Sequence, residues 1–286
     1  MPEPEAGLAV RPQKALRGLA RSCLNVLRLA PVRRFLRERR VLTLSVGPGA
    51  GLRFSPGPST ERYGSGSNEL PVQEALASLL FPGAVLYDVG ANVGFLTMIG
   101  ARLVGATGLV YAFEPVRTNT AVLRRNLRLN GFHNVVVIEK AVSSVPGREQ
   151  LILALDSGGA AISVAERPPD AAGVMEVEVT SIDEMIRGGG ARPPTVVKID
   201  VEGAEIQVLR GMEKTLELHR PAVVYEIDGP DEKHVDAKAD LCRAFLEARG
   251  YRVSRLPDSY PDNRWRVRHY LARREGEAQI QGDCSA

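Results

Sequence analysis

The most restrictive feature of the sequence is the apolar run Val85-Leu-Tyr-Asp-Val89, which leads directly into the glycine-rich segment Gly90-Ala-Asn-Val-Gly94. Such a run is typical of a strand that is buried on both faces of a sheet. A helical pattern follows at about 94–104, so the chain is predicted to form a strand, a tight turn and a helix in succession. Units of this kind build parallel sheets that are covered by helices.

The same alternation continues toward the C-terminus. Strands are expected at 85–89, 109–113, 134–138, 195–200 and 222–227, and helices near 69–80, 94–104, 117–130, 203–218 and 235–249. Further antiparallel strands are expected at 150–154 and 174–179, and a final hairpin at 251–255 and 265–271. The expected fold class is therefore α/β, with a Rossmann-like, mostly parallel sheet flanked by helices and a helical N-terminal appendage.

Three parts of the chain differ in composition. Residues 1–62 are expected to form a basic helical arm with a short hairpin at 41–54, residues 63–274 the main domain, and residues 275–286 a flexible tail. Between residues 11 and 40 there are ten Lys or Arg and one acid, Glu38. Apolar residues recur in this arm at helical spacing, so it either docks on the main domain or a second subunit, or contacts a membrane surface or lipid substrate. The oligomeric state is left open.

Composition excludes several classes of protein. The cysteines Cys23, Cys242 and Cys284 are far apart and form no CxxC pair, which argues against a zinc site or a disulfide framework and favours a reducing, cytoplasmic compartment. The sequence has no apolar run long enough to span a membrane. Aromatic residues make up 5% of the chain, which argues against an RNA surface that stacks bases, and no nucleic-acid partner is expected.

The spacing of the glycines distinguishes between two kinds of cofactor. A turn that binds a dinucleotide has the pattern GxGxxG, whereas here Asn92 takes the middle position and Gly94 comes one residue early. This leaves less room for a pyrophosphate and favours S-adenosylmethionine (SAM), whose amino-acid part can bind the turn amides and the Asn92 side chain. We expect the cofactor contacts of this segment to be Asp88, Gly90, Ala91, Asn92 and Gly94.

Two later strand ends complete the expected cofactor site. Glu114, followed by Pro115, ends the second strand, where a carboxylate can accept hydrogen bonds from both ribose hydroxyls. This role is common to SAM and NAD sites, so Glu114 alone does not identify the cofactor. Lys140 and Ala141 follow the third strand, and residues there would flank an adenine ring.

These motifs resemble the FkbM-like methyltransferases over about residues 65–255. The likeness is carried by Tyr87-Asp-Val-Gly-Ala-Asn-Val-Gly94, Ala112-Phe-Glu-Pro115, Ala141-Val-Ser143 and, most specifically, Val197-Lys-Ile-Asp-Val-Glu-Gly-Ala-Glu205. The resemblance implies a class I SAM-dependent fold and the transfer of methyl groups, usually to oxygen. Members of the family act on sugars, natural products and glycolipids, so it implies a small-molecule or glycan acceptor without identifying it.

Acidic residues follow the fourth and fifth strands, where an acceptor would lie. Asp200 and Glu202 come after one strand, and Glu226 ends the next. One of them could act as a general base on an acceptor hydroxyl, or two could bind Mg²⁺, which would lower the pKa of that hydroxyl. We favour direct action by Asp200, which is also expected to border the cofactor.

Other polar residues are assigned structural roles. Asp183 is expected to help cap the helix near 182–187, and Glu205 is also expected to have a structural role. None of the four histidines, His133, His219, His234 and His269, lies in a recognisable catalytic context.

Three alternatives to a small-molecule methyltransferase remain at this point. The first is an NAD(P)-dependent Rossmann oxidoreductase, and the second is a non-catalytic module that has kept the fold. The third is a nucleic-acid methyltransferase, although the Asn/Asp-Pro-Pro-aromatic motif of many base methyltransferases is missing where Asp200-Val-Glu-Gly203 stands.

Overall fold

The computed structural model describes residues 40–57, 63, 65–154, 160–162, 171–260 and 266–274. The predicted basic arm up to residue 39 and the predicted tail at 275–286 lie outside the described residues, as do Cys23 and Cys284. Cys242 is buried and forms no disulfide.

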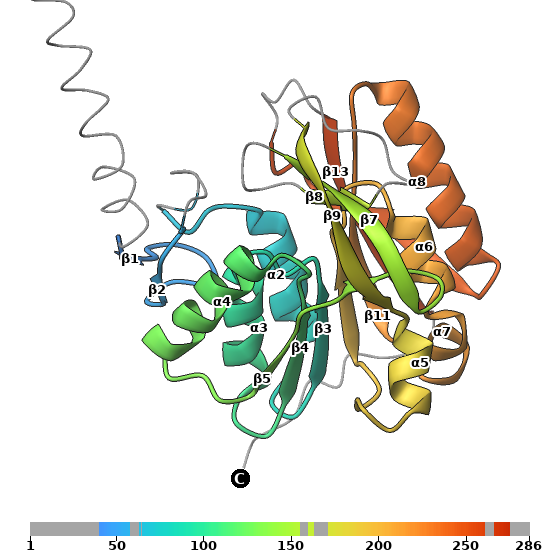
Figure 1. Ribbon diagram of the computed structural model, residues 1–286. Helices are drawn as coiled ribbons and strands as arrows, with labels where there is room; N and C mark the ends of the chain where they lie inside the picture. The colour runs from blue at the N-terminus through green and yellow to red at the C-terminus, as the bar shows by residue number, and fades with distance from the viewer. Residues whose placement is uncertain are drawn as a thin grey trace, which may run out of the picture. The chain divides into compact units, whose positions relative to one another are not determined.

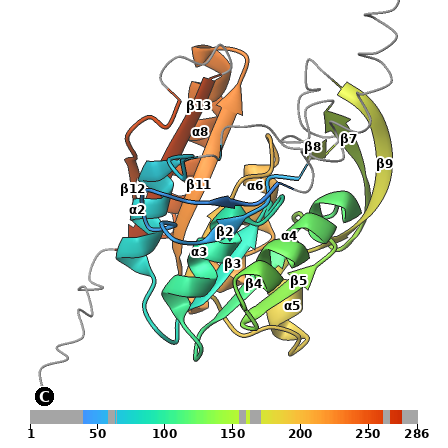
Figure 2. The same ribbon diagram turned by 90° about the vertical axis from the view of Figure 1, so that its left-hand side faces the viewer.

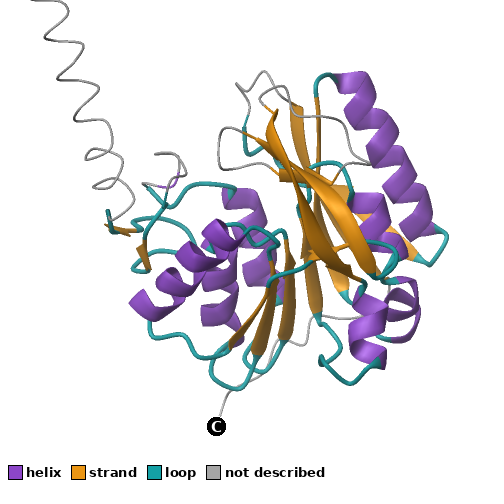
Figure 3. Ribbon diagram, in the orientation of Figure 1, coloured by secondary structure: helices purple, strands orange, loops and turns teal. Residues whose placement is uncertain are grey.

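The central sheet has seven strands in the order β12-β13-β11-β10-β3-β4-β5 (Figures 1 and 3). They are β3 (Val85–Val89), β4 (Leu109–Phe113), β5 (Val135–Ile138), β10 (Val196–Ile199), β11 (Ala222–Gly229), β12 (Tyr251–Arg255) and β13 (Arg266–Arg274). The first five are parallel, and β13 pairs antiparallel with both β11 and β12. The predicted α/β class, the parallel strands and the final hairpin are thus confirmed.

Helices cover both faces of this sheet. One face carries α2 (Leu70–Leu79), α3 (Phe95–Val104), α4 (Arg117–Leu129) and the hairpin β1 (Leu42–Thr43) to β2 (Arg53–Phe54), and it is turned toward the viewer in Figure 2. The other face carries α5 (Ile182–Arg187), α6 (Glu205–Arg210), α7 (Glu213–Leu218) and α8 (Glu232–Glu247). Because side chains alternate along a strand, Leu86 lies in the first core while Val85 and Tyr87 lie in the second. None of the helices in the described part of the chain is long and apolar enough to cross a bilayer.

The predicted antiparallel additions form a separate sheet. Its strands are β6 (Ala141–Val142), β9 (Ala171–Thr180), β7 (Gly147–Ala154) and β8 (Ala160–Ile162), in the order β6-β9-β7-β8. β7 pairs antiparallel with β9, as expected, and also with β8, a strand that the sequence does not predict. β6 joins β9 in parallel. Along the chain, the first strand of this second sheet, β6, begins shortly after β5 ends.

The single helix predicted at 203–218 is wrong, because the chain breaks it into α6 and α7. At the break, a Cβ on Gly211 would lie 2.1 Å from the carbonyl oxygen of Ser143, so the backbones pack in direct contact there. The predicted cap of α5 is also wrong: Ser181 caps that helix, accepting from the amide of Glu184 at 3.3 Å. Asp183 caps α7 instead, accepting from the amides of Lys214 and Thr215 at 2.9 and 2.8 Å.

The N-terminal hairpin is part of the main core. Leu44 and Phe54 are almost fully buried against α2 and α3, although the sequence groups the hairpin with the basic arm. Asn126 of α4 binds the residue that follows β2: its Oδ1 accepts from Ser55 N at 2.8 Å, and its Nδ2 donates to Ser55 O and Val93 O. One buried amide thus connects the hairpin to the glycine-rich turn.

Replacement of Asn126 by Ala should be strongly destabilising. It leaves the polar backbone groups of Ser55 and Val93 buried without their partner, and we expect the free energy of unfolding to fall by about 2–4 kcal/mol. Chemical denaturation measures this change. Arg128→Ala, at an exposed position of the same helix, is the control and should change stability by no more than about 0.5 kcal/mol. Equal effects of the two substitutions would contradict the role given to Asn126.

Candidate functional site

The candidate site lies at the carboxyl ends of β3, β10 and β11, where the strand order of the sheet reverses. Ligands of open α/β sheets bind at such a position. The glycine turn, residues 90–94, leaves β3 with positive φ at Gly90, Asn92 and Gly94 (79°, 47° and 87°). Glycine takes this left-handed conformation without strain, and Asn tolerates it better than most residues.

The two glycines of the turn make room for protein rather than for a ligand. A Cβ on Gly90 would lie 1.7 Å from the carbonyl oxygen of Asp200, and one on Gly94 would lie 2.8 Å from Cγ of Leu123. The space where a side chain of Gly90 would lie is therefore filled by the backbone of Asp200. Gly90 instead lets the end of β10 come close to the turn, and Gly94 lets α4 pack against it.

The backbone amides of the turn already donate hydrogen bonds within the chain. The amides of Gly90 and Ala91 both donate to Phe113 O, at 3.0 and 2.9 Å, and the amide of Gly94 donates to Ala91 O. The amide of Asn92 donates to Oε2 of Glu114 at 2.9 Å. The amides of Gly90, Ala91 and Asn92 therefore fasten the turn to the end of β4, and that of Gly94 closes the turn on itself. Contact of these amides with the amino-acid part of a cofactor stays a prediction.

Glu114 is the residue that closes this link between the turn and β4. Its side chain is buried, and its Oε1 accepts from Val116 N at 2.9 Å and from Asn119 Nδ2 at 3.3 Å. Burial raises the pKa of Glu114 to about 7, although these hydrogen bonds and that from Asn92 oppose the rise. A carboxylate offers roughly four acceptor positions, so three bonds within the protein leave about one for a ribose hydroxyl. Glu114 can therefore accept about one further hydrogen bond, and its contact with the ribose hydroxyls stays a prediction.

A buried lysine lies between the turn and β10. Nζ of Lys198 is 3.1 Å from both Gly90 O and Oδ2 of Asp200, and 3.6 Å from Oδ1 of Asp88. Burial lowers the pKa of Lys198, but the charges of Asp200 and Asp88 outweigh that effect and hold it above its ordinary value. Thr97 donates to Oδ2 of Asp88 at 2.5 Å. Asp88, predicted to contact a cofactor, thus has its carboxylate 1% exposed and bound inside the protein.

The residues after β5 contact the second sheet. Nζ of Lys140 lies 3.0 Å from Oε2 of Glu178 on β9. Ala141 packs in a small apolar cluster with Leu151, Val177 and Val179. In this structure the side chain of Lys140 is therefore paired with β9, and Ala141 presents little surface for an adenine ring.

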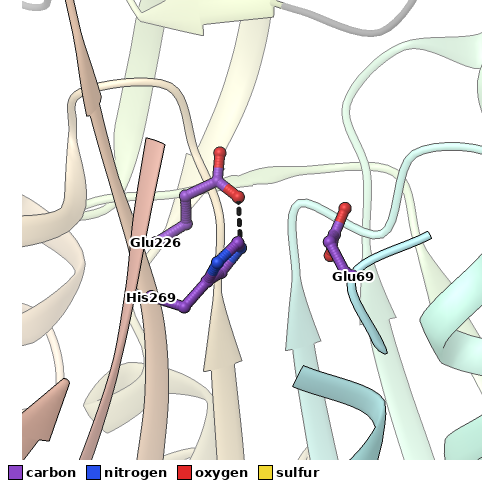
Figure 4. A group of neighbouring side chains, drawn as sticks. All are labelled: Glu69, Glu226 and His269. Carbon is purple, nitrogen blue, oxygen red and sulfur yellow. Dashed lines mark ion pairs between the residues drawn. The ribbon is translucent and has the colours of Figure 1, made fainter. Parts of the chain in front are cut away.

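Beside the turn lies a pocket that we call the acidic pocket. It is lined by Glu69, Val72, Lys198, Ile199, Asp200, Val224, Tyr225, Glu226 and His269. Ile199 pairs with Tyr225 in the parallel register, so Asp200 and Glu226 extend from the same edge of the sheet. Glu226 is directly opposite His269 in the β11–β13 pairing, and their Oε2 and Nε2 atoms are 2.7 Å apart (Figure 4).

The three acids predicted to be catalytic come together here. Burial, followed by the charges of Asp228, Asp200 and Glu226, raises the pKa of Glu202 well above its ordinary value. Burial and the charges of Asp200 and Glu69 do the same for Glu226. Each acid is thus close enough to oppose the ionisation of its neighbours. Perturbed carboxylates of this kind are typical of functional sites.

Two residues of this pocket, Glu69 and His269, are not predicted as functional by the sequence. His269 falls inside the predicted hairpin strand at 265–271, but no sequence pattern places that strand beside β11. Glu69 precedes α2 with a left-handed φ of 50°. Three of the four described non-glycine residues with positive φ, namely Glu69, Asn92 and Glu202, lie around this site. Strained backbone often accumulates at functional positions.

The acid Glu205, next to the pocket, should make stability depend on pH. It is 2% exposed, accepts from Gly203 N at 2.8 Å, and has its pKa raised from 4.5 to about 7, mainly by burial. The folded state therefore binds the proton more tightly than the unfolded state, and stability falls as pH rises from about 4.5 to about 7. We expect Glu205→Gln to reduce this fall and to stabilise the protein above pH 7 by about 1–3 kcal/mol.

Denaturation curves at several pH values between about 5 and 8 test this expectation. Glu217→Gln, at an exposed position of α7, is the matched control and should leave the pH dependence unchanged. A Glu205→Gln profile that runs parallel to the wild-type profile would contradict the raised pKa.

Comparison with known proteins identifies related sequences. Residues 88–253 match the family described as "Methyltransferase FkbM domain". The chain is 31% identical over 152 residues to the hexuronic acid methyltransferase AglP of Haloferax volcanii, covering 53% of this chain and 59% of AglP. It is 29% identical over 160 residues to the 31-O-demethyl-FK506 methyltransferase FkbM of Streptomyces tacrolimicus, covering 47% and 61%. The matches thus span about 60% of the length of these curated relatives.

A solved structure is also similar. The methyltransferase FkbM from Methylobacillus flagellatus KT superposes with a TM-score of 0.47 at 19% identity, covering 70% of this chain and 50% of that one.

Proposed function

Because the chain belongs to the FkbM methyltransferase family, we propose that it transfers a methyl group from SAM to a hydroxyl group of a small molecule, a sugar or a glycolipid. The observation that carries the proposal is the acidic pocket, which lies directly beside the glycine turn. Two relatives are named for a hexuronic acid and for an oxygen of a demethylated natural product. The first name supports a sugar acceptor, and the second supports an oxygen acceptor.

The charge of the pocket favours SAM over a nicotinamide dinucleotide. SAM supplies a methyl group on a positively charged sulfonium, whereas NAD(P) brings a negatively charged pyrophosphate to the glycine turn. Asp200 and Glu226 line the pocket, and Glu202 interacts with both. A cluster of carboxylates attracts the first cofactor and repels the second. In this proposal, Glu114 binds the ribose, and the pocket receives the acceptor beside the methyl group.

Asp200 is the residue that we assign to the acceptor hydroxyl. Lys198 holds its carboxylate at 3.1 Å, and a quarter of the Asp200 side chain remains exposed. A hydroxyl is a weak nucleophile, so the enzyme must align it and remove its proton as the methyl group transfers. Asp200 can do both from a fixed position at the end of β10.

The role of Glu114 leads to a prediction about cofactor binding. We expect Glu114→Ala to weaken the binding of S-adenosylhomocysteine by about 1.5–3 kcal/mol, or roughly 10- to 150-fold, because a charge-assisted hydrogen bond to the ribose is lost. Isothermal titration measures the affinity, and a thermal melt checks that the variant is folded. Glu217→Ala is the control. Unchanged affinity in the Glu114 variant would exclude a ribose contact.

The role of Asp200 leads to a separate prediction about turnover. Asp200→Asn should slow the transfer of labelled methyl from SAM to an acceptor in a metabolite extract by about 10²- to 10⁴-fold, the usual contribution of general base catalysis. Its affinity for S-adenosylhomocysteine should stay close to that of the wild type. Asp240→Asn, at an exposed position of α8, is the control. Wild-type turnover in the Asp200 variant would remove this residue from the chemistry. Cofactor binding without any transfer by the wild type would favour a non-catalytic module.

A further inference from the structure

Three potential metal ligands meet in the acidic pocket from separate elements. Glu69 precedes α2, Glu226 belongs to β11 and His269 to β13, and their ligand atoms all lie within 4.8 Å of one another (Figure 4). We propose that Glu69, Glu226 and His269 together bind one divalent transition-metal ion.

The separation of these atoms suits a single ion. Imidazole nitrogen and carboxylate oxygen bind ions such as Zn²⁺ at about 2.0–2.2 Å. Two ligands at that distance from one ion lie about 3–4 Å apart, so atoms within 4.8 Å of one another need only small side-chain movements to reach it. Three protein ligands leave coordination positions for a water or an acceptor, as in catalytic metal sites.

His269 provides an independent observation that points to a cation. The residue is 3% exposed, and in the described part of the chain the only partner of its Nε2 is Oε2 of Glu226, which lies 2.7 Å away. A ring lone pair and a carboxylate at this distance repel each other unless a proton or a metal ion lies between them. Nδ1 of the ring lies 3.3 Å from Oγ of Ser259, which orients Nε2 toward the two carboxylates.

The side chain of Glu69 is also held in place by hydrogen bonds. Its Oε1 accepts from Oη of Tyr260 and from Nδ2 of Asn68, both at 3.0 Å. Tyr260 follows Ser259 directly, so the segment after β12 positions a ligand on each side of the pocket. Supporting hydrogen bonds of this kind are typical of metal sites, where they fix the direction of the ligands.

The charges around the three ligands favour a cation. Asp200 acts electrostatically on both Glu226 and His269, and Asp228 acts on Glu226. The cation that lines the pocket, Lys198, is already paired with Asp88 and Asp200. Carboxylates that are removed from water at such close range are stabilised either by a bound cation or by a proton.

The ligand set indicates which ions to test. Mg²⁺ binds oxygen ligands, whereas imidazole suits Zn²⁺, and the two carboxylates also suit Mn²⁺. This set differs from the Mg²⁺ site that the sequence suggests among Asp200, Glu202 and Glu226. A role for the ion in methyl transfer rests on the proposed function: in this pocket it would lower the pKa of the acceptor hydroxyl and orient it.

Titration of the full chain with metal ions tests the site directly. After treatment with EDTA and desalting, the protein should bind one Zn²⁺ or one Mn²⁺ per chain by isothermal titration. Glu226→Gln and His269→Asn should each weaken binding by at least about 100-fold, because even residues that only support a ligand contribute about 10- to 100-fold. Glu217→Gln and His219→Asn, both at exposed positions, are the matched controls and should bind as the wild type does.

Parallel measurements separate this proposal from the proposed function. Circular dichroism and the affinity for S-adenosylhomocysteine report on folding, and Glu69→Gln tests the same site if a variant in the sheet does not fold. The proposal is overturned if the wild type binds neither ion, or if Glu226→Gln or Glu69→Gln binds as tightly as the wild type. Metal binding without methyl transfer would reject the proposed function and leave the metal site in place.

Discussion

The ion pairs of Lys198 hold the site together, because this one ammonium joins the ends of two neighbouring strands. Asp88 near the end of β3 and Asp200 after β10 are carboxylates on adjacent parallel strands, and Lys198 contacts both. It also binds the carbonyl of Gly90, where the absence of a side chain lets Asp200 approach. Without this buried cation, two carboxylates would repel each other at the strand reversal. The glycine turn and the acidic pocket are therefore parts of one electrostatic unit.

The parts of the fold that the sequence predicts well are those set by local patterns. The strands at 85–89 and 109–113 have the predicted bounds, because these apolar runs lie between segments that contain Gly or Pro. The break between α6 and α7 could not be predicted from helical spacing. It depends on contact between Gly211 and Ser143, and on Asp183, which caps a helix distant in sequence. Such contacts depend on how the elements pack.

The candidate site likewise contains residues that local sequence patterns predict and residues whose positions depend on packing. Asp200, Glu202 and Glu226 could be grouped from sequence, because the ends of parallel strands meet at one edge of a sheet. His269 could not, because its position depends on the antiparallel register between β11 and β13. The roles of individual groups were also hidden: a motif does not reveal that the turn amides bind β4, or that Lys140 reaches across to Glu178.

The position of β13 in the sheet has a consequence for how the chain is made. This strand comes last along the described sequence but lies between β11 and β12. During synthesis on the ribosome, β11 therefore has an unpaired edge until the final strand emerges, although the parallel strands β3, β4, β5 and β10 are already complete. Exposed edges of this kind can pair with other chains. The strand that contributes His269 to the acidic pocket is thus also the one that covers this edge once the chain is complete.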